Sequence, residues 1–235
     1  MSTHYILQIE TATQVCSAAL SANGETMACI DVDEPNVHAS RLTLLVQELL
    51  QKTGLAISDL SAVAVSKGPG SYTGLRIGVS TAKGLCYAAD LPLIGVDTLA
   101  GMATGFASQG QLDRNALLCP MVDARRMEVY TAVFDGHVQP IAPAAAVIVG
   151  PQSFEYLGLG KRIMLFGSGA DKLDAIFSED KQIEVVTGFK NSASHLSRLA
   201  DQAYRKESFE NVAYFEPFYL KDFVATTPKQ GVRSH

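Results

Sequence analysis

A glycine-rich turn is the feature of this sequence that points most directly to chemistry. Residues 67–76 read KGPGSYTGLR and follow a short valine-rich apolar segment, which is typical of a buried strand. Gly68 and Gly70 can adopt backbone angles that other residues resist, and Ser71 can cap a helix that begins after it. The free N–H groups of such a turn favour an anion such as phosphate. The turn is not a P-loop, because no Gly-Lys-Ser/Thr follows, and a strand-to-helix corner can also carry two glycines without any ligand.

Two acidic residues stand where predicted strands end and could act as a pair. Glu10 closes the predicted strand 5–10, and Asp123 follows the predicted strand 117–122. Carboxylates that face one cleft are suitable ligands for Mg²⁺. A structural role in two hairpins explains the same residues equally well, so the sequence leaves both interpretations open.

The histidines and cysteines give no indication of a metal site. No two histidines stand one helical turn apart, as the HxxxH pair of a metal-binding helix requires. The four cysteines occur singly in apolar surroundings, which is typical of buried, reduced thiols in a cytosolic protein. His38 stands at the start of the predicted helix 38–52, where capping or contact with solvent explains it. We therefore predict no metal and a cytoplasmic location.

The helix predicted at 71–89 carries an unusual stripe of small side chains. Gly74, Gly78, Ala82 and Cys86 recur every four residues and must share one face. Each glycine weakens a helix by about 1 kcal/mol relative to alanine, so the stripe suggests a packing reason. Either this helix lies deep inside its domain, or the stripe meets the backbone of a partner chain.

The helix predicted at 38–52 has a broad apolar stripe that faces a core, with Leu42 and Leu45 in it. Leu44 lies on the other side, among polar residues, without a role inside the domain. Three strands precede this helix. Two strand-and-helix units follow it, the last with Asp97 as the cap of a helix at 98–107.

The two halves of the chain resemble each other. Placing Glu10 over Asp123 also puts Ile9 on Val122 and Leu20 on Val133, so each half opens with a strand, an acidic residue, a short turn and a second strand. Such a repeat predicts two similar lobes that face each other across a cleft.

Length and composition agree with a globular protein of two lobes. The chain has 235 residues, 47% of them hydrophobic, and no apolar run as long as a membrane span. Its net charge of −5 argues against unaided binding of nucleic acid, which depends on neutralising phosphates.

Several segments resemble the bacterial TsaB (YeaZ) family. The segments that carry the resemblance are ILQIETATQVCSAAL (6–20), HASRLTLLVQELL (38–50), SKGPGSYTGLRIGVSTAKGL (66–85), DTLAGMA (97–103), DARRMEVY (123–130) and EPFYLKDF (216–223). The resemblance implies an α/β protein with the actin-like, Hsp70-like ATPase fold, which consists of duplicated ribonuclease H-like lobes. We expect residues 1–107 and 192–222 to form the first lobe, residues 108–191 the second, smaller lobe, and residues 223–235 a polar tail.

The resemblance also implies a function. TsaB-like proteins take part in forming N6-threonylcarbamoyladenosine at position 37 of tRNAs that read codons starting with A. They act there as a scaffold without catalytic activity, paired with the transferase TsaD and joined by the ATPase TsaE. We expect a homodimer when the chain is isolated, contact with tRNA only through the complex, and no contact with a membrane.

The pairing implied by the resemblance uses the two predicted N-terminal helices. The expected interface residues are His38, Arg41, Leu42, Leu44, Leu45, Thr73, Gly74, Ile77, Gly78, Thr81, Ala82 and Leu85. A Gly78→Leu substitution is expected to disrupt pairing by forcing the helices apart.

The nucleotide cleft of the fold is expected to be vestigial. Actin-like ATPases use Asp-x-Gly turns that let phosphates approach the backbone, whereas Glu10-Thr11-Ala12 and Asp123-Ala124-Arg125 contain no glycine. The residues expected around this cleft are Glu10, Thr11, Gly68, Gly70, Ser71, Asp123 and Arg125. We predict no tightly bound cofactor and leave ATP and Mg²⁺ open for the complex. The alternative function is a stand-alone actin-like ATPase or kinase; a metallopeptidase is remote.

Overall fold

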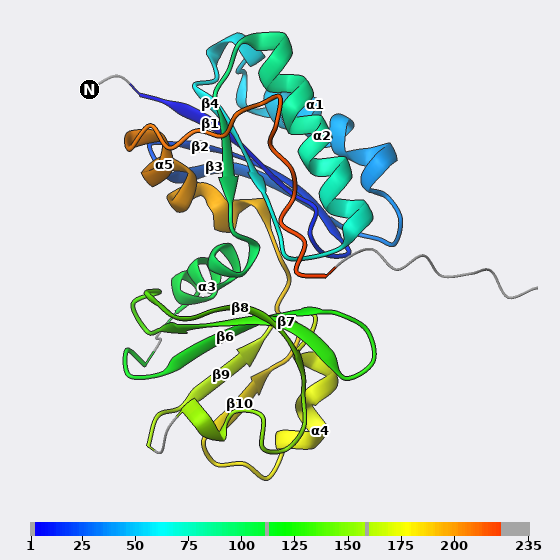
Figure 1. The fold of residues 1–235 in the computed structure, drawn as a ribbon. Helices are drawn as coiled ribbons and strands as arrows, with labels where there is room; N and C mark the ends of the chain where they lie inside the picture. Colours follow the sequence, from blue (N-terminus) through cyan, green and yellow to red (C-terminus); the bar gives the residue numbers. More distant parts are fainter. Residues whose placement is uncertain (1–2, 111–112, 158–159, 222–235) are drawn as a thin grey trace, which may run out of the picture.

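Two stacked lobes, each built on one five-stranded sheet, make up the protein (Figure 1). The structure, a computed structural model, describes residues 3–110, 113–157 and 160–221. The predicted polar tail, 223–235, lies outside these residues. Among the described helices, none is both long and apolar enough to cross a membrane.

The sheet of the first lobe has the strand order β3-β2-β1-β4-β5. Its strands are β1 (Tyr5–Glu10), β2 (Val15–Ala22), β3 (Glu25–Asp33), β4 (Ala62–Ser66) and β5 (Leu93–Val96). The first three form an antiparallel meander, while β4 pairs parallel with both β1 and β5. The central strands are buried on both faces, which explains their nearly continuous apolar sequences.

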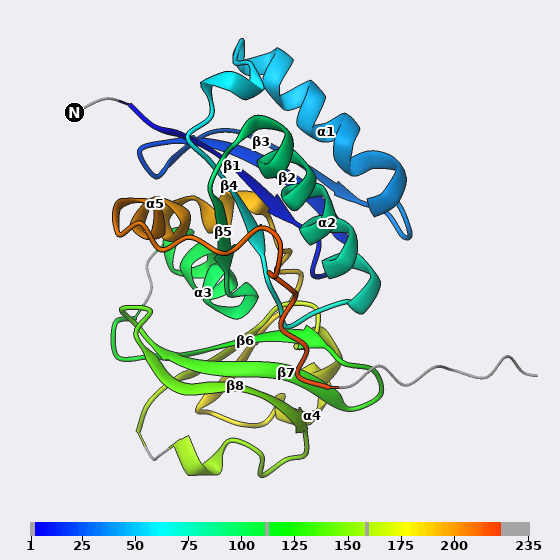
Figure 2. The same ribbon diagram turned by 45° about the horizontal axis from the view of Figure 1, so that its top comes forward.

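Helices cover both faces of this sheet, as Figure 2 shows. On one face lie α1 (His38–Thr53) and α2 (Tyr72–Ala89), whose apolar residues share a core with β1, β2 and β4. On the other face lies α5 (Ser197–Arg205), preceded by a short 3₁₀ turn at Ala193–Leu196. The helical segment over residues 193–205 thus begins with one turn of 3₁₀ geometry.

The second lobe repeats the topology of the first. Its strands are β6 (Leu117–Asp123), β7 (Glu128–Asp135), β8 (Pro140–Ile148), β9 (Ile163–Phe166) and β10 (Ile183–Val186), in the order β8-β7-β6-β9-β10. The parallel and antiparallel pairings match those of the first sheet strand for strand. Glu10 ends β1 and Asp123 ends β6, so the alignment of the two halves is confirmed.

Smaller elements complete the second lobe and link it to the first. The short helix α4 (Asp174–Phe177) packs beside β10, and 3₁₀ turns occur at Glu155–Leu157 and Asp171–Leu173. A further 3₁₀ turn, Ile57–Asp59, precedes β4 in the first lobe. Helix α3 (Thr98–Ser108) lies between the lobes and packs its apolar face on β6, β7 and β9. We keep the division into 1–107 with 192–222 and 108–191 as a proposal.

The last described segment, residues 209–221, is called the C-terminal strap here. It pairs with β5 at Glu210, forms a turn over residues 211–215 and then runs past α2 toward the second lobe (Figure 2). Phe215 is its anchor, since this side chain is buried in the core of the first lobe.

Candidate functional site

The glycine turn between β4 and α2 has the predicted local structure, but its surroundings differ from the prediction. Ser71 caps α2, with its Oγ accepting a hydrogen bond of 3.2 Å from the Gly74 N–H. A Cβ on Gly70 would lie 2.5 Å from the carbonyl oxygen of Ala12, and one on Gly68 would overlap the carbonyl oxygen of Phe218. The chain's own backbone therefore packs directly against the glycine turn, and the Ser71 N–H donates to the Ala12 carbonyl oxygen at 2.7 Å instead of being free for a phosphate.

The stripe of small residues on α2 is also explained within the chain. A Cβ on Gly74 would overlap the carbonyl oxygen of Thr11, and one on Gly78 would overlap the hydroxyl oxygen of the same residue. The small stripe thus lets α2 pack directly on the turn between β1 and β2. Gly74, Gly78 and Ala82, which we expected at a partner interface, are all buried within this chain.

Two further expected interface residues belong to the core. Leu42 and Leu45 on α1 are each 1% exposed and pack in the core that α1 shares with the sheet. Their apolar periodicity marks the inner face of α1. Within this chain they have almost no exposed surface that a partner could contact.

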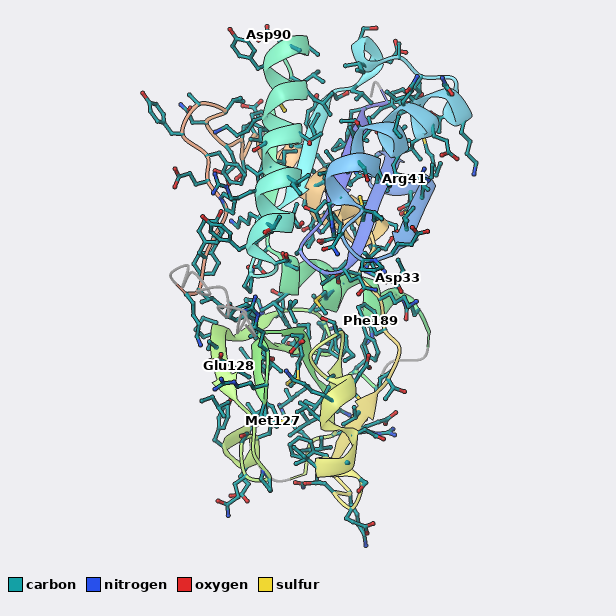
Figure 3. All side chains as sticks on the ribbon, turned by 90° about the vertical axis from the view of Figure 1, so that its right-hand side faces the viewer. Asp33, Arg41, Asp90, Met127, Glu128 and Phe189 are labelled. Atoms are coloured by element: carbon teal, nitrogen blue, oxygen red, sulfur yellow. The ribbon has the colours of Figure 1, made fainter. Side chains whose placement is uncertain are left out.

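Six of the seven remaining expected interface residues, all except His38, lie on the outer side of α1 and α2. Arg41 and Thr73 are exposed, and Leu44 is 50% exposed despite its apolar side chain. Ile77, Thr81 and Leu85 on α2 are half-buried. Figure 3 shows the two helices side by side, with Arg41 on α1. These six residues are called the two-helix face below.

His38 differs from its prediction. It is the first residue of α1, the cap position is Val37, and no side chain caps this helix. The His38 side chain is buried rather than solvated, and its Nε2 has no hydrogen-bond partner among the described residues. It lines a cavity of about 530 Å³ that also contacts the start of α2.

Glu10 is directed into the protein rather than into a cleft. Its Oε1 accepts hydrogen bonds from the Ala12 N–H at 2.6 Å and from the Ser66 hydroxyl at 3.0 Å. Burial disfavours the charged form and raises the pKa of this carboxyl group from 4.5 to about 7, and the hydrogen bonds offset only part of that effect.

A cavity of about 440 Å³ opens between the lobes. It is lined by Gly70, Ser71, Tyr72, Thr73, Asp123, Ala124, Arg125, Glu128, Tyr130 and residues 218–221. The structure therefore brings together four of the predicted cleft residues, Gly70, Ser71, Asp123 and Arg125. Glu10, Thr11 and Gly68 are buried and do not line this cavity.

The residues at this cavity do not fit a Mg²⁺–nucleotide. Asp123 is exposed but already forms an ion pair with Lys172 and accepts the Arg125 N–H at 3.1 Å. Glu10, the other expected ligand, is 1% exposed. No group of three or more metal-ligating side chains exists among the described residues.

The C-terminal strap is the part of the site that the sequence analysis missed. Its Phe218 N–H donates to the carbonyl oxygen of Lys67 at 2.7 Å, next to the glycine turn. The Tyr219 ring lies 4.9 Å from the Tyr72 ring, and Lys221 forms a 2.5 Å ion pair with Glu128 of the second lobe. The segment EPFYLKDF was recognised only as a family motif, because an extended strap leaves no periodic signal.

The comparisons with known proteins identify the family. The model of TsaD, tRNA N6-adenosine threonylcarbamoyltransferase, matches residues 35–229. The tRNA threonylcarbamoyladenosine biosynthesis protein TsaB of Bacillus subtilis is 31% identical over 225 residues, which cover 92% of this chain and 93% of that protein. The chain belongs to the TsaB family. The family resemblance seen in the sequence is confirmed.

The TsaB protein of Escherichia coli is 41% identical over 129 residues, or 55% of this chain, and that of Haemophilus influenzae is 34% identical over 125 residues, or 53% of this chain. In these alignments the chain spans about half the length of each relative, 54% and 51%.

Solved structures agree with this assignment. YeaZ from Pseudomonas aeruginosa superimposes with a TM-score of 0.74 at 26% identity, covering 94% of this chain and all of that one. An inorganic polyphosphate/ATP-glucomannokinase from Arthrobacter, at 12% identity, has a TM-score of 0.52 over 86% of this chain and 99% of its own, which shows a shared fold only. The predicted actin-like fold is confirmed.

Proposed function

We propose that this chain is a subunit without catalytic activity of its own in the formation of N6-threonylcarbamoyladenosine at position 37 of tRNAs that read codons starting with A. It pairs there with TsaD through the two-helix face, TsaE joins the pair, and tRNA is bound only by the complex. Membership in the TsaB family supports the pathway. The observation that supports a non-catalytic role is the packing of the β1–β2 turn against the glycine turn, in which the Ala12 carbonyl oxygen takes up the Ser71 N–H.

The two-helix face has the chemistry of a helix-packing surface. Leu44 exposes half of its apolar side chain, while Ile77 and Leu85 are partly exposed beside it on the neighbouring helix. Arg41 is its only charged residue. Covering such a surface removes apolar area from water, which favours association at roughly 25 cal/mol per Å². For the same reason we propose that the isolated chain forms a homodimer through this face.

The pairing is tested by mixing the purified chain with TsaD of the same bacterium and measuring mass by gel filtration with light scattering. We expect a heterodimer, and threonylcarbamoylation of tRNA that requires this chain. The variant Leu44→Asp should lose pairing while keeping its thermal unfolding transition, because Leu44 is half exposed. Gln51→Asp, on an exposed position of α1, is the control that should still pair. Separate elution of the wild-type chain with unchanged modification would contradict the proposal.

The open cavity between the lobes favours one alternative, a stand-alone actin-like ATPase or kinase. Arg125 and Ser71 line it and could contact a phosphate. ATP turnover by the isolated chain would support this alternative if Asp123→Ala abolished it. We expect no turnover, because the buried Glu10 and the paired Asp123 leave no carboxylate free to hold Mg²⁺ there.

A further inference from the structure

We propose that Arg114, His137 and Arg198 form a second site, which binds a phosphate group of an RNA backbone. The site lies at the β7–β8 turn, whereas the cavity between the lobes lies at the β6–β7 turn, and these turns are at opposite ends of β7. The RNA assignment depends on the proposed function, while the phosphate chemistry does not.

Three segments that are distant in sequence build this site. A cavity of about 340 Å³ is enclosed by the C-terminal end of α3, the β7–β8 turn at Gly136–Val138, Arg114 and Arg198 of α5. A Cβ on Gly136 would overlap the carbonyl oxygen of Arg114, so the two backbones are in direct contact. The position of Arg114 is therefore set by packing and not by chance on a free loop.

The charges at this site lack carboxylate partners. Arg114 Nη1 lies 3.1 Å from His137 Nδ1, which accepts the hydrogen bond without neutralising the guanidinium. Arg198 forms no hydrogen bond or ion pair in the part of the chain that the structure describes. Both guanidinium groups at this cavity are therefore without a carboxylate partner among the described residues.

The neighbouring acids are engaged elsewhere. Asp135 Oδ1 accepts the N–H groups of His137 at 2.9 Å and Gln139 at 2.8 Å, and thereby shapes the β7–β8 turn. Asp113 Oδ1 accepts the Asn115 N–H at 2.9 Å. Neither carboxylate forms an ion pair with the two arginines.

Helix dipoles do not account for both arginines. The C-terminal end of α3 attracts a cation and could explain one of them. Arg198, by contrast, is far from the C-terminal end of its own helix α5, so the dipole of that helix does not attract it. Two guanidinium groups at one cavity can together bind several oxygens of a phosphate group. A single carboxylate has only two oxygens and would occupy fewer of their N–H donors.

The hydroxyl groups at the site limit the alternatives. Thr104 Oγ1 donates to the Ala100 carbonyl at 2.8 Å, and Ser108 Oγ donates to the Gly105 carbonyl at 2.7 Å. Their hydrogens are used within α3, so the side-chain donors left for a ligand are those of the two guanidinium groups and the Nε2–H of His137. This favours an anion over a neutral, hydroxyl-bearing ligand.

The test measures binding of labelled tRNA to the complete complex of this chain, TsaD and TsaE at several salt concentrations. The double variant Arg114→Gln/Arg198→Gln should weaken binding about tenfold and lower the slope of log K against log salt by about 1, as expected for loss of a phosphate contact. Lys181→Gln/Lys206→Gln removes the same charge from exposed positions elsewhere and should change neither quantity appreciably.

Inorganic phosphate, titrated calorimetrically into the chain alone, separates the two sources of the anion. Saturable binding that the double variant loses, with unchanged tRNA affinity, would show a phosphate site for a small ligand and overturn the RNA assignment. The site itself would be overturned if both double variants weakened tRNA binding equally. It would also be overturned if neither variant changed tRNA binding and the wild-type chain bound no inorganic phosphate. Failure of the wild-type chain to pair with TsaD would instead contradict the proposed function. The phosphate titration would still test the site, because it uses the chain alone.

Discussion

At the scale of single residues, Glu10 is a buried carboxyl group whose charged form destabilises the folded protein. Its pKa is raised to about 7 because it is buried, so the folded protein binds a proton more tightly than the unfolded chain does, with its ordinary value of 4.5. The contribution of Glu10 to stability is therefore greatest below pH 4.5 and is lost as the pH rises through 7.

Glu10→Gln should accordingly raise the free energy of unfolding at pH 8 by about 1 to 3 kcal/mol, and by much less at pH 4.5. Glutamine keeps an oxygen that can accept from Ala12 and Ser66 but carries no charge. Urea denaturation at both pH values measures the difference, with Glu48→Gln on the exposed side of α1 as the control. A large loss of stability at pH 8 would show that the charged carboxylate is needed.

The glycines of α2 offer a matched pair at the same scale. Gly78→Ala should destabilise the protein by about 2 to 4 kcal/mol, because its Cβ would overlap the Thr11 hydroxyl and α2 would have to move. Gly84→Ala should stabilise it by about 0.5 to 1 kcal/mol, since nothing lies within 4 Å of that Cβ and alanine favours a helix.

Thermal and urea unfolding of both variants check these values. If both substitutions changed the free energy of unfolding by equally small amounts, the β1–β2 turn would have to move away from α2 at little cost. The same contact makes Gly78→Leu unsuitable as a test of pairing, because it would disrupt the subunit itself.

At the scale of elements, the C-terminal strap is attached to α2 by few but well-defined contacts. Lys83 Nζ donates to the carbonyl oxygens of Ala213 at 3.1 Å and Phe215 at 3.0 Å. The Phe215 side chain is buried in the core of the first lobe, where its ring lies next to Gly95 of β5. The strap also closes one side of the cavity between the lobes.

Lys83→Met should lower the free energy of unfolding by about 1 to 3 kcal/mol, because it removes two hydrogen bonds from a charged donor. Amide hydrogen exchange at Phe218 should become faster than in the wild type, since its N–H is protected by the strap contact with Lys67. Lys181→Met, at an exposed position of the second lobe, should leave the exchange at Phe218 unchanged. Unchanged exchange in Lys83→Met would mean that Phe215 alone holds the strap.

At the scale of the whole molecule, His195 lies where the two lobes meet. Its ring stacks on Phe189 at 5.4 Å, and Gly105 of α3 leaves room for it. Burial lowers its pKa from the ordinary 6.5, against the opposing field of Asp31. The unfolded chain thus takes up this proton first, so the stability that the neutral ring provides is present above pH 6.5 and is lost as the pH falls.

His195→Gln should therefore flatten the part of the pH–stability profile below 6.5. Because Glu10 changes stability with the opposite sign in an overlapping range, the comparison is the difference between wild-type and variant profiles from pH 5 to 8. Gln202→Ala, which changes an exposed residue without a titratable group, should give a difference that stays constant with pH. A constant difference for His195→Gln as well would contradict the pH dependence assigned to the lobe junction.

Local patterns in the sequence determined the elements and their repetition. Apolar periodicity indicated α1, α2 and the strands, Ser71 and Asp97 were correctly read as caps, and the alignment of Glu10 with Asp123 predicted the two lobes. These signals depend on neighbours within a few residues, so they can be read without knowing the fold. Leu44 was likewise predicted to point outward and is half exposed.

Only the tertiary structure decided what each exposed or small surface contacts. The sequence showed that α2 has a bare stripe, but not that Thr11 fills it, nor that the strap covers the glycine turn, nor that Arg114 and Arg198 meet at one cavity. A small side chain indicates a close neighbour without saying which segment supplies it. That choice is made by long-range packing of the whole chain, which is why Gly74, Gly78 and Ala82 looked like an interface and are core.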